Sequence, residues 1–199
     1  MTSIKPFKIQ TSEQELKDLK QRLTLTRWPD KETPPDWSQG IPLSYMIEIH
    51  DYWLNQYDWP ARLALLNQWP GFKTEIDGLG IHFLHIKSAE PDALPLLMTH
   101  GWPGSIVEFQ KIIGPLTNPT EHGGLASDAF DLVIPTLPGF GYSDKPVSPG
   151  WNIDRIATAS IREAIPEPKV HLQAPTGWDG RSPLDITIIA DNQAALTKA

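Results

Sequence analysis

Apolar residues recur along this chain at two spacings, and the spacing changes near residue 71. Up to that point the 3.6-residue period of an α-helix dominates. It predicts three helices: residues 13–26, a segment after Ile41-Pro42 that carries Leu43 to Tyr57, and a segment from Pro60 to Trp69. The capping-box spacing of Ser12 and Glu15 supports the start of the first helix.

After residue 71 the apolar positions follow the two-residue period of β-strands. A β-hairpin is predicted from Phe72–Ile76, the turn Asp77-Gly78 and Gly80–Ile86. A strand at Leu94–Thr99, a helix at 106–116 and a strand at Phe130–Pro135 then predict a parallel βαβ unit. This order predicts an α/β protein with helices first, then a β-hairpin and then a parallel βαβ unit, which is the order in which an α/β-hydrolase sheet starts.

The same pattern divides the chain into three regions. Residues 1–70 are the helical extension, residues 71–157 are the first part of the core sheet, and residues 158–199 are a divergent tail that prolines interrupt often. Within the tail, Thr158–Ile165 has a helical pattern and Lys169–Ala174 a strand pattern.

Composition narrows the possible partners. The formal net charge of −7 and the isoelectric point near 5.3 argue against nucleic acid or an anionic membrane surface, because both require concentrated positive charge. Without cysteine, the chain has neither disulfides nor thiolate metal ligands. Residues 1–10 do not resemble a secretory signal, and no window approaches the ~20 apolar residues of a membrane span. We therefore expect a cytoplasmic location.

The strongest candidate for chemistry is the turn His100-Gly-Trp-Pro-Gly104, which directly follows a predicted strand. Such a turn can present the backbone N–H of Trp102 to a developing negative charge, as oxyanion holes do. Equally, Gly and Pro can form a sharp turn on which Trp102 packs. The spacing by itself favours neither interpretation.

Other motifs are weaker. The loop Leu137–Ser143 has two glycines of a G-x-G-x-x-G phosphate loop, but Asp144 occupies the third position, so a dinucleotide site is not predicted. Ser143 is interpreted as a loop hydroxyl, because Lys145 replaces the last glycine of a nucleophile elbow. His82 and His85 would lie on opposite faces of a strand and cannot share a metal ion. We expect no cofactor and no metal.

Taken together, the motifs from about Pro6 to Ala157 resemble the epoxide hydrolase family, in the branch of the microsomal and juvenile-hormone epoxide hydrolases. Seven segments carry the resemblance: Arg27-Trp-Pro-Asp30, Asp36-Trp-Ser-Gln-Gly40, Tyr52 to Trp59, Leu66-Asn67, Ile76 to His85, His100 to Ser105, and Leu137 to Ser143. Their occurrence in family order makes the resemblance specific.

The resemblance implies a truncated α/β-hydrolase fold with a helical amino-terminal extension. It also implies a mechanism. An Asp carboxylate opens an apolar epoxide, aromatic ones included, to give an ester, and water activated by a His paired with an acidic residue hydrolyses the ester to the diol. Tyr side chains from a lid polarise the epoxide oxygen. Oxyanion or substrate binding is implied for His100, Gly101, Trp102 and Pro103. Detoxification and aromatic hydrocarbon catabolism are implied roles.

The tail departs from the family pattern, in which the nucleophile elbow reads Gly-Gly-Asp-Trp-Gly. Here Asp179 stands 36 residues after Ser143, close to the expected position of the nucleophile, but Arg181 occupies a place that the elbow reserves for glycine. Preserved length with lost identity suggests a reading-frame shift near codon 158; a genuine short paralogue is the competing explanation. Asp179 is thus the candidate nucleophile of a chain that we expect to be inactive.

Two other functions stay open. A non-catalytic module could bind a small apolar ligand, or associate with itself or a complete hydrolase through the open edge of its sheet. A related α/β-hydrolase reaction, on an ester or a haloalkane, is the third option, because fold does not fix function.

Overall fold

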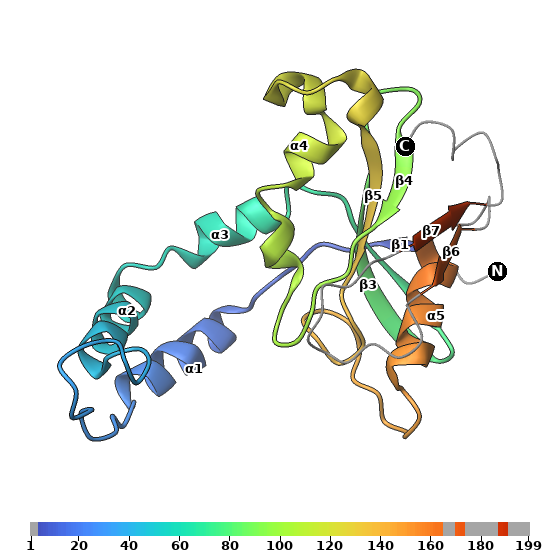
Figure 1. Ribbon diagram of the computed structural model, residues 1–199. Coiled ribbons are helices and arrows are strands. Elements are labelled where there is room, and N and C mark those ends of the chain that lie inside the picture. The colour runs from blue at the N-terminus through green and yellow to red at the C-terminus, as the bar shows by residue number, and fades with distance from the viewer. Residues whose placement is uncertain (1–3, 165–169, 174–186, 191–199) are drawn as a thin grey trace. The chain divides into compact units, whose positions relative to one another are not determined.

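The computed structural model describes residues 4–164, 170–173 and 187–190 (Figure 1). The chain forms two compact units, and each is described by itself. The helical unit comprises Ile9–Gln68, and the sheet unit comprises the segment up to Lys8 together with the chain from Trp69 onward.

The helical unit contains the three helices that the apolar period predicts. They are α1 (Glu13–Thr24), α2 (Leu43–Asn55) and α3 (Trp59–Leu66). The capping box of α1 is present: the Ser12 side chain accepts from the Glu15 N–H, and the Glu15 carboxylate accepts from the Ser12 N–H. Local polar spacing thus fixes where this helix begins.

The sheet unit is organised around five strands in the order β1-β2-β3-β5-β4. Their bounds are β1 Lys5–Pro6, β2 Gly71–Ile76, β3 Leu79–Ile86, β4 Leu94–Leu97 and β5 Phe130–Pro135. β1, β2, β3 and β5 are successively antiparallel, whereas β4 and β5 are parallel. The predicted hairpin and the predicted parallel pair are both confirmed.

The hairpin turn has the chemistry that its sequence requires. Asp77 and Gly78 have φ angles of 48° and 80°, the left-handed pair that a two-residue turn between twisted strands needs. The side chains of Ile76, Leu79 and Ile81 pack into one buried cluster with Ala159 of α5 (Ile153–Ala164). Trp151, just before α5, packs against the same cluster.

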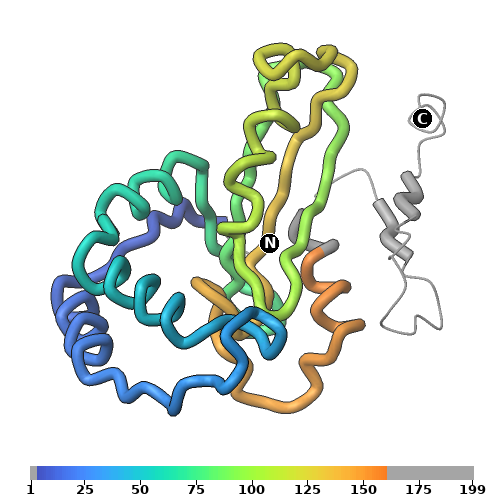
Figure 2. Tube along the Cα trace, turned by 60° about the vertical axis from the view of Figure 1, so that its left-hand side comes forward, coloured from blue at the N-terminus to red at the C-terminus, as the bar shows by residue number. Residues whose placement is uncertain are grey.

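The connection between β4 and β5 differs from the predicted helix at 106–116. It consists of a 3₁₀ turn, η1 (Ile106–Phe109), and a separate short helix, α4 (Ile113–Thr117). Pro115 explains the break, since a continuous helix would need an N–H at that residue. In α4, Pro115 lies in the first turn, where no N–H is needed. Two further 3₁₀ turns, η2 (Pro119–His122) and η3 (Ala126–Asp128), complete the connection, and Figures 1 and 2 show α4 alongside β5.

The rest of the described chain is a two-stranded antiparallel pair, β6 (Val170–Gln173) with β7 (Thr187–Ala190). The candidate nucleophile Asp179 lies outside the described residues. Within the described part of the chain, no helix combines the length and the apolar character that crossing a membrane requires.

Candidate active site

The turn His100–Gly104 follows β4, at the carboxyl end of a strand that runs parallel to β5. The loop Leu137–Asp144 leaves the same end of β5. In α/β sheets this edge is where ligands bind, because the backbone groups of the turns converge there. Two of the motifs singled out in the sequence therefore lie at the carboxyl ends of neighbouring strands.

Backbone donors are available on this turn. Within the described part of the chain, the N–H groups of Gly101, Trp102 and Gly104 donate no hydrogen bond. The Trp102 side chain is 85% exposed, so it does not pack into the core, and the peptide between Trp102 and Pro103 is cis. The exposure of Trp102 argues against the alternative in which the turn serves to pack this ring.

The far side of the turn is fixed by a second capping box. The Ser105 hydroxyl accepts from the Val107 N–H at 3.3 Å, and the Glu108 carboxylate accepts from the Ser105 N–H at 3.0 Å. Gly104 is needed because a Cβ there would meet the Glu108 carboxylate and the Gly101 carbonyl oxygen. The turn is thus held by short local contacts that the sequence encodes.

His100 is a buried clamp and not an exposed base. Its Nδ1 lies 3.0 Å from the Gly101 carbonyl oxygen, and its Nε2 accepts from the Leu137 N–H at 3.1 Å. Because a carbonyl only accepts and a backbone N–H only donates, the ring must be neutral with its proton on Nδ1. The Phe140 ring packs edge-on at 5.3 Å between centroids. His100 thereby joins the two turns.

Ser143 is a structural hydroxyl in a buried position. Its Oγ accepts from the His82 N–H at 2.9 Å and donates to the Thr136 carbonyl at 2.7 Å. Since its proton is committed to a carbonyl, the hydroxyl is not arranged as a nucleophile.

The two strand histidines differ in environment. His82 is fully buried, with Nδ1 2.8 Å from the Thr136 hydroxyl, and its Nε2 has no hydrogen-bond partner. Burial, and then the charge of Lys73, lower the pKa of His82 to about 4. Burial also lowers the pKa of His85, on which Lys87 and Asp131 act in opposite directions. Among the described residues, no group of three or more side chains is placed to hold a metal ion.

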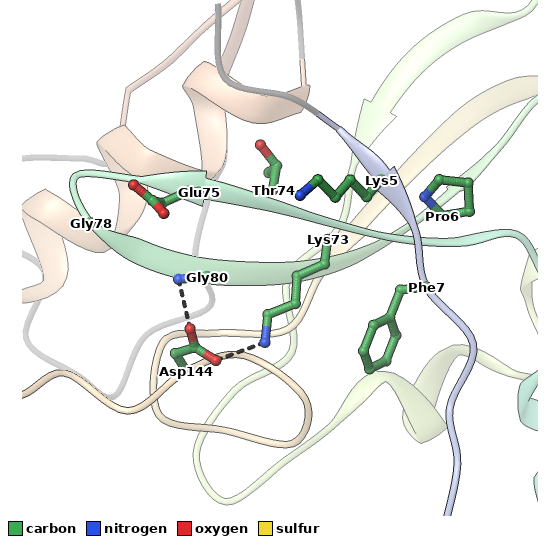
Figure 3. Close-up of a pocket in the computed structure, with 9 residues that line it drawn as sticks. All are labelled: Lys5, Pro6, Phe7, Lys73, Thr74, Glu75, Gly78, Gly80 and Asp144. Carbon is green, nitrogen blue, oxygen red and sulfur yellow. Dashed lines mark hydrogen bonds and ion pairs between the residues drawn. The ribbon is translucent and has the colours of Figure 1, made fainter.

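A hollow of about 540 Å³ lies on the β1-β2-β3 side of the sheet unit (Figure 3). It is lined by Lys5, Pro6, Phe7, Lys73, Thr74, Glu75, Gly78, Gly80 and Asp144. None of its lining residues belongs to the turn His100–Gly104, so this hollow is not a substrate pocket for that turn.

Sequence reasoning named the turn but missed several residues that hold it. Leu137 and Phe140 contact His100 from a loop 37 residues away in sequence, and nothing in their spacing indicates this. Glu108 could have been found, because Ser105 and Glu108 have the capping-box spacing.

Comparison with known families identifies the chain. The family model "Epoxide hydrolase N terminus" matches residues 4–109, more than half of the 199 residues. The chain belongs to the epoxide hydrolase family. The matched region includes the strands β2, β3 and β4, the turn His100–Gly104 and η1.

Individual epoxide hydrolases are similar in sequence to this chain. A Stigmatella aurantiaca protein assigned to the epoxide hydrolases is 56% identical over 156 residues, which cover 78% of this chain and 36% of that protein. Epoxide hydrolase 1 of Sus scrofa is 41% identical over 163 residues, covering 80% and 36%. The chain spans a little over a third of the length of these curated relatives.

The solved structures give the fold. The juvenile hormone epoxide hydrolase of the silkworm Bombyx mori superposes with a TM-score of 0.72 at 37% identity, covering 80% of this chain and 38% of that one. The predicted α/β-hydrolase fold is confirmed, and the described sheet corresponds to a portion of it.

Proposed function

We propose that this epoxide hydrolase family member carries the oxyanion-binding turn of an active site that converts apolar epoxides to vicinal diols. The observation that supports it is the set of unengaged N–H groups of Gly101, Trp102 and Gly104 at the carboxyl end of β4. Donors aimed from a rigid turn stabilise the oxyanion that forms when an ester intermediate is cleaved. The buried ring of His100 holds the turn through its bonds to the Gly101 carbonyl and the Leu137 N–H.

The nucleophile is the open part of this proposal. Asp179 is the candidate, with Gly177 two residues before it and Arg181 two residues after it. A side chain at the latter position collides with the sharp turn on which such a nucleophile sits. We therefore expect the 199-residue chain to hydrolyse no epoxide by itself.

A frame shift near codon 158 remains our explanation for this departure. The proposed junction falls within α5, which spans Ile153–Ala164. Sequencing the gene tests it: the alternative frame must restore Gly-Gly-Asp-Trp-Gly, and its absence would leave the short paralogue as the explanation.

Turnover of styrene oxide is the direct test of function. We expect no diol from the purified chain, and diol from a chimera in which residues 4–157 replace the corresponding part of the Stigmatella aurantiaca relative. Diol formation by the chain itself that is lost in Asp179→Asn would overturn its inactivity. A folded but inactive chimera would overturn the proposed role of the turn.

Association is a second candidate function, and the position of β4 favours it. Among the described strands β4 pairs with β5 alone, so its outer edge can accept another strand. Saturable ligand binding or oligomer formation without turnover would support this module. A cytoplasmic location and a role in detoxification or aromatic hydrocarbon catabolism stay predictions.

A further inference from the structure

The loop Leu137–Asp144 is fastened to β3 at both of its ends. Directly after the end of β5, the Thr136 N–H donates to the His82 carbonyl at 2.8 Å. Where the loop finishes, the Asp144 N–H donates to the Gly80 carbonyl at 2.7 Å. Within the loop, the Gly139 N–H donates to the Asp144 carbonyl at 3.0 Å, which closes it on itself.

The Ser143 hydroxyl connects the two ends. It accepts from the His82 N–H and donates to the Thr136 carbonyl, so it continues the β3–β5 ladder at the point where β5 has ended. Without this hydroxyl, the buried N–H and C=O would both lose their partners.

The Asp144 carboxylate adds a second attachment (Figure 3). One oxygen accepts from the Gly80 N–H at 3.1 Å and the other from Lys73 Nζ at 2.7 Å. Gly80 has to be glycine for this contact, because a Cβ there would collide with the carboxylate. The end of the loop is therefore tied to both strands of the hairpin.

The beginning of the loop carries the contact to the turn. The Leu137 N–H, directly after the fastened Thr136, donates to His100 Nε2. The His100 ring in turn bonds to the carbonyl of Gly101, whose own N–H is one of the unengaged donors. A displaced loop would withdraw the Leu137 N–H and release the ring.

We propose that Ser143 and Asp144 are positioning residues for the oxyanion-binding turn, acting through the Leu137 N–H on the ring of His100. The Ser143 hydroxyl and the Asp144 carboxylate fix the loop on β3, and the loop fixes the proton of His100 on Nδ1. The purpose of this positioning, a turn that is ready to bind an oxyanion, rests on the proposed function.

Ring ¹⁵N spectra of the ¹⁵N-histidine-labelled full chain test this inference without any substrate. His100 is assigned with His100→Gln, and its wild-type pattern is expected to be that of a single Nδ1–H tautomer whose Nε2 accepts a hydrogen bond. In Ser143→Ala and in Asp144→Asn we expect this pattern to be lost, together with ~10-fold faster amide exchange at Leu137 than in wild type. Ser143→Thr keeps the hydroxyl and should keep the pattern.

Matched variants separate positioning from general weakening. Ser160→Ala removes a hydroxyl of similar burial on α5. Asp131→Asn alters a carboxylate that also receives a backbone N–H, from Ser88, and also pairs with a lysine, Lys87. Both should leave the His100 pattern unchanged.

Each variant has a result that would overturn the proposal. An unchanged His100 pattern in Ser143→Ala or in Asp144→Asn overturns the proposal for that residue, and an equal change in the matched variants overturns it for both. If Ser143→Ala does not fold, the exposed Asp144→Asn decides, with Ser143→Thr as the folded comparison. Because no epoxide is used, failure of the proposed hydrolase activity would not alter these results.

Discussion

The backbone N–H of Leu137 donates to Nε2 of the buried His100 ring at 3.1 Å, and this bond joins the turn after β4 to the loop after β5. His100→Leu removes the acceptor for Leu137 and the donor for the Gly101 carbonyl. We expect a loss of about 1–3 kcal/mol in the free energy of unfolding. Urea unfolding followed by circular dichroism measures it. His122→Leu, at an exposed histidine, is the control, and equal losses in the two variants would contradict the role given to His100.

His82 makes stability depend on pH. Its pKa is about 4 in the folded chain against an ordinary value of 6.5, so the unfolded chain binds more protons between these values. Its contribution is therefore fully present above pH 6.5 and falls as the pH drops toward 4, by on the order of 3 kcal/mol in total. His85 acts with the same sign.

A variant isolates the His82 contribution. His82→Asn can retain the bond to the Thr136 hydroxyl but does not titrate, so urea unfolding between pH 7.5 and 4.5 should show a weaker pH dependence than wild type. An unchanged slope would show that His82 is not the buried titrating group.

Two glycines of the turn His100–Gly104 should respond differently to substitution by alanine. A Cβ at Gly104 meets the Gly101 carbonyl oxygen at 2.7 Å, whereas a Cβ at Gly101 has nothing within 4 Å. We expect Gly104→Ala to cost about 1–3 kcal/mol and Gly101→Ala to cost under about 0.5 kcal/mol. Thermal or urea unfolding of the two variants measures both costs. Equal costs would contradict the close approach of a Cβ at Gly104 to the Gly101 carbonyl oxygen.

Asn67 should be sensitive in the helical unit. Its side chain accepts from the Ile9 N–H and donates to the Ile9 carbonyl, both at 2.9 Å, and so pairs with both backbone groups of a buried residue. Asn67→Asp removes the donor and places a carboxylate against the carbonyl, so amide exchange at Ile9 should accelerate by ~10-fold or more. Asn55→Asp, which alters only a surface contact with Asp51, should leave that amide unchanged.

Local signals in the sequence predicted the elements well where they were strong. The 3.6-residue period and the capping box gave α1 to α3, and Asp77-Gly78 gave the hairpin. The prediction of one helix over 106–116 is wrong, because Pro115 lacks the N–H that a continuous helix would need at that residue. β1 was not predicted, since two residues carry no period and β1 exists only through pairing with β2.

Sequence by itself determined the family and the order of the hairpin and the parallel strands, and it predicted the turn His100–Gly104 as a site for chemistry, because these depend on residue types and spacing along the chain. Only the tertiary structure decided how that turn is joined to the loop Leu137–Asp144 and how this loop is held on the hairpin. The Leu137 donor, the Ser143 bridge and the Asp144 pair with Lys73 join residues 37 to 71 positions apart. Such contacts leave no periodic trace in the sequence, because they are individual hydrogen bonds between a loop and a strand or turn that the sheet brings next to it.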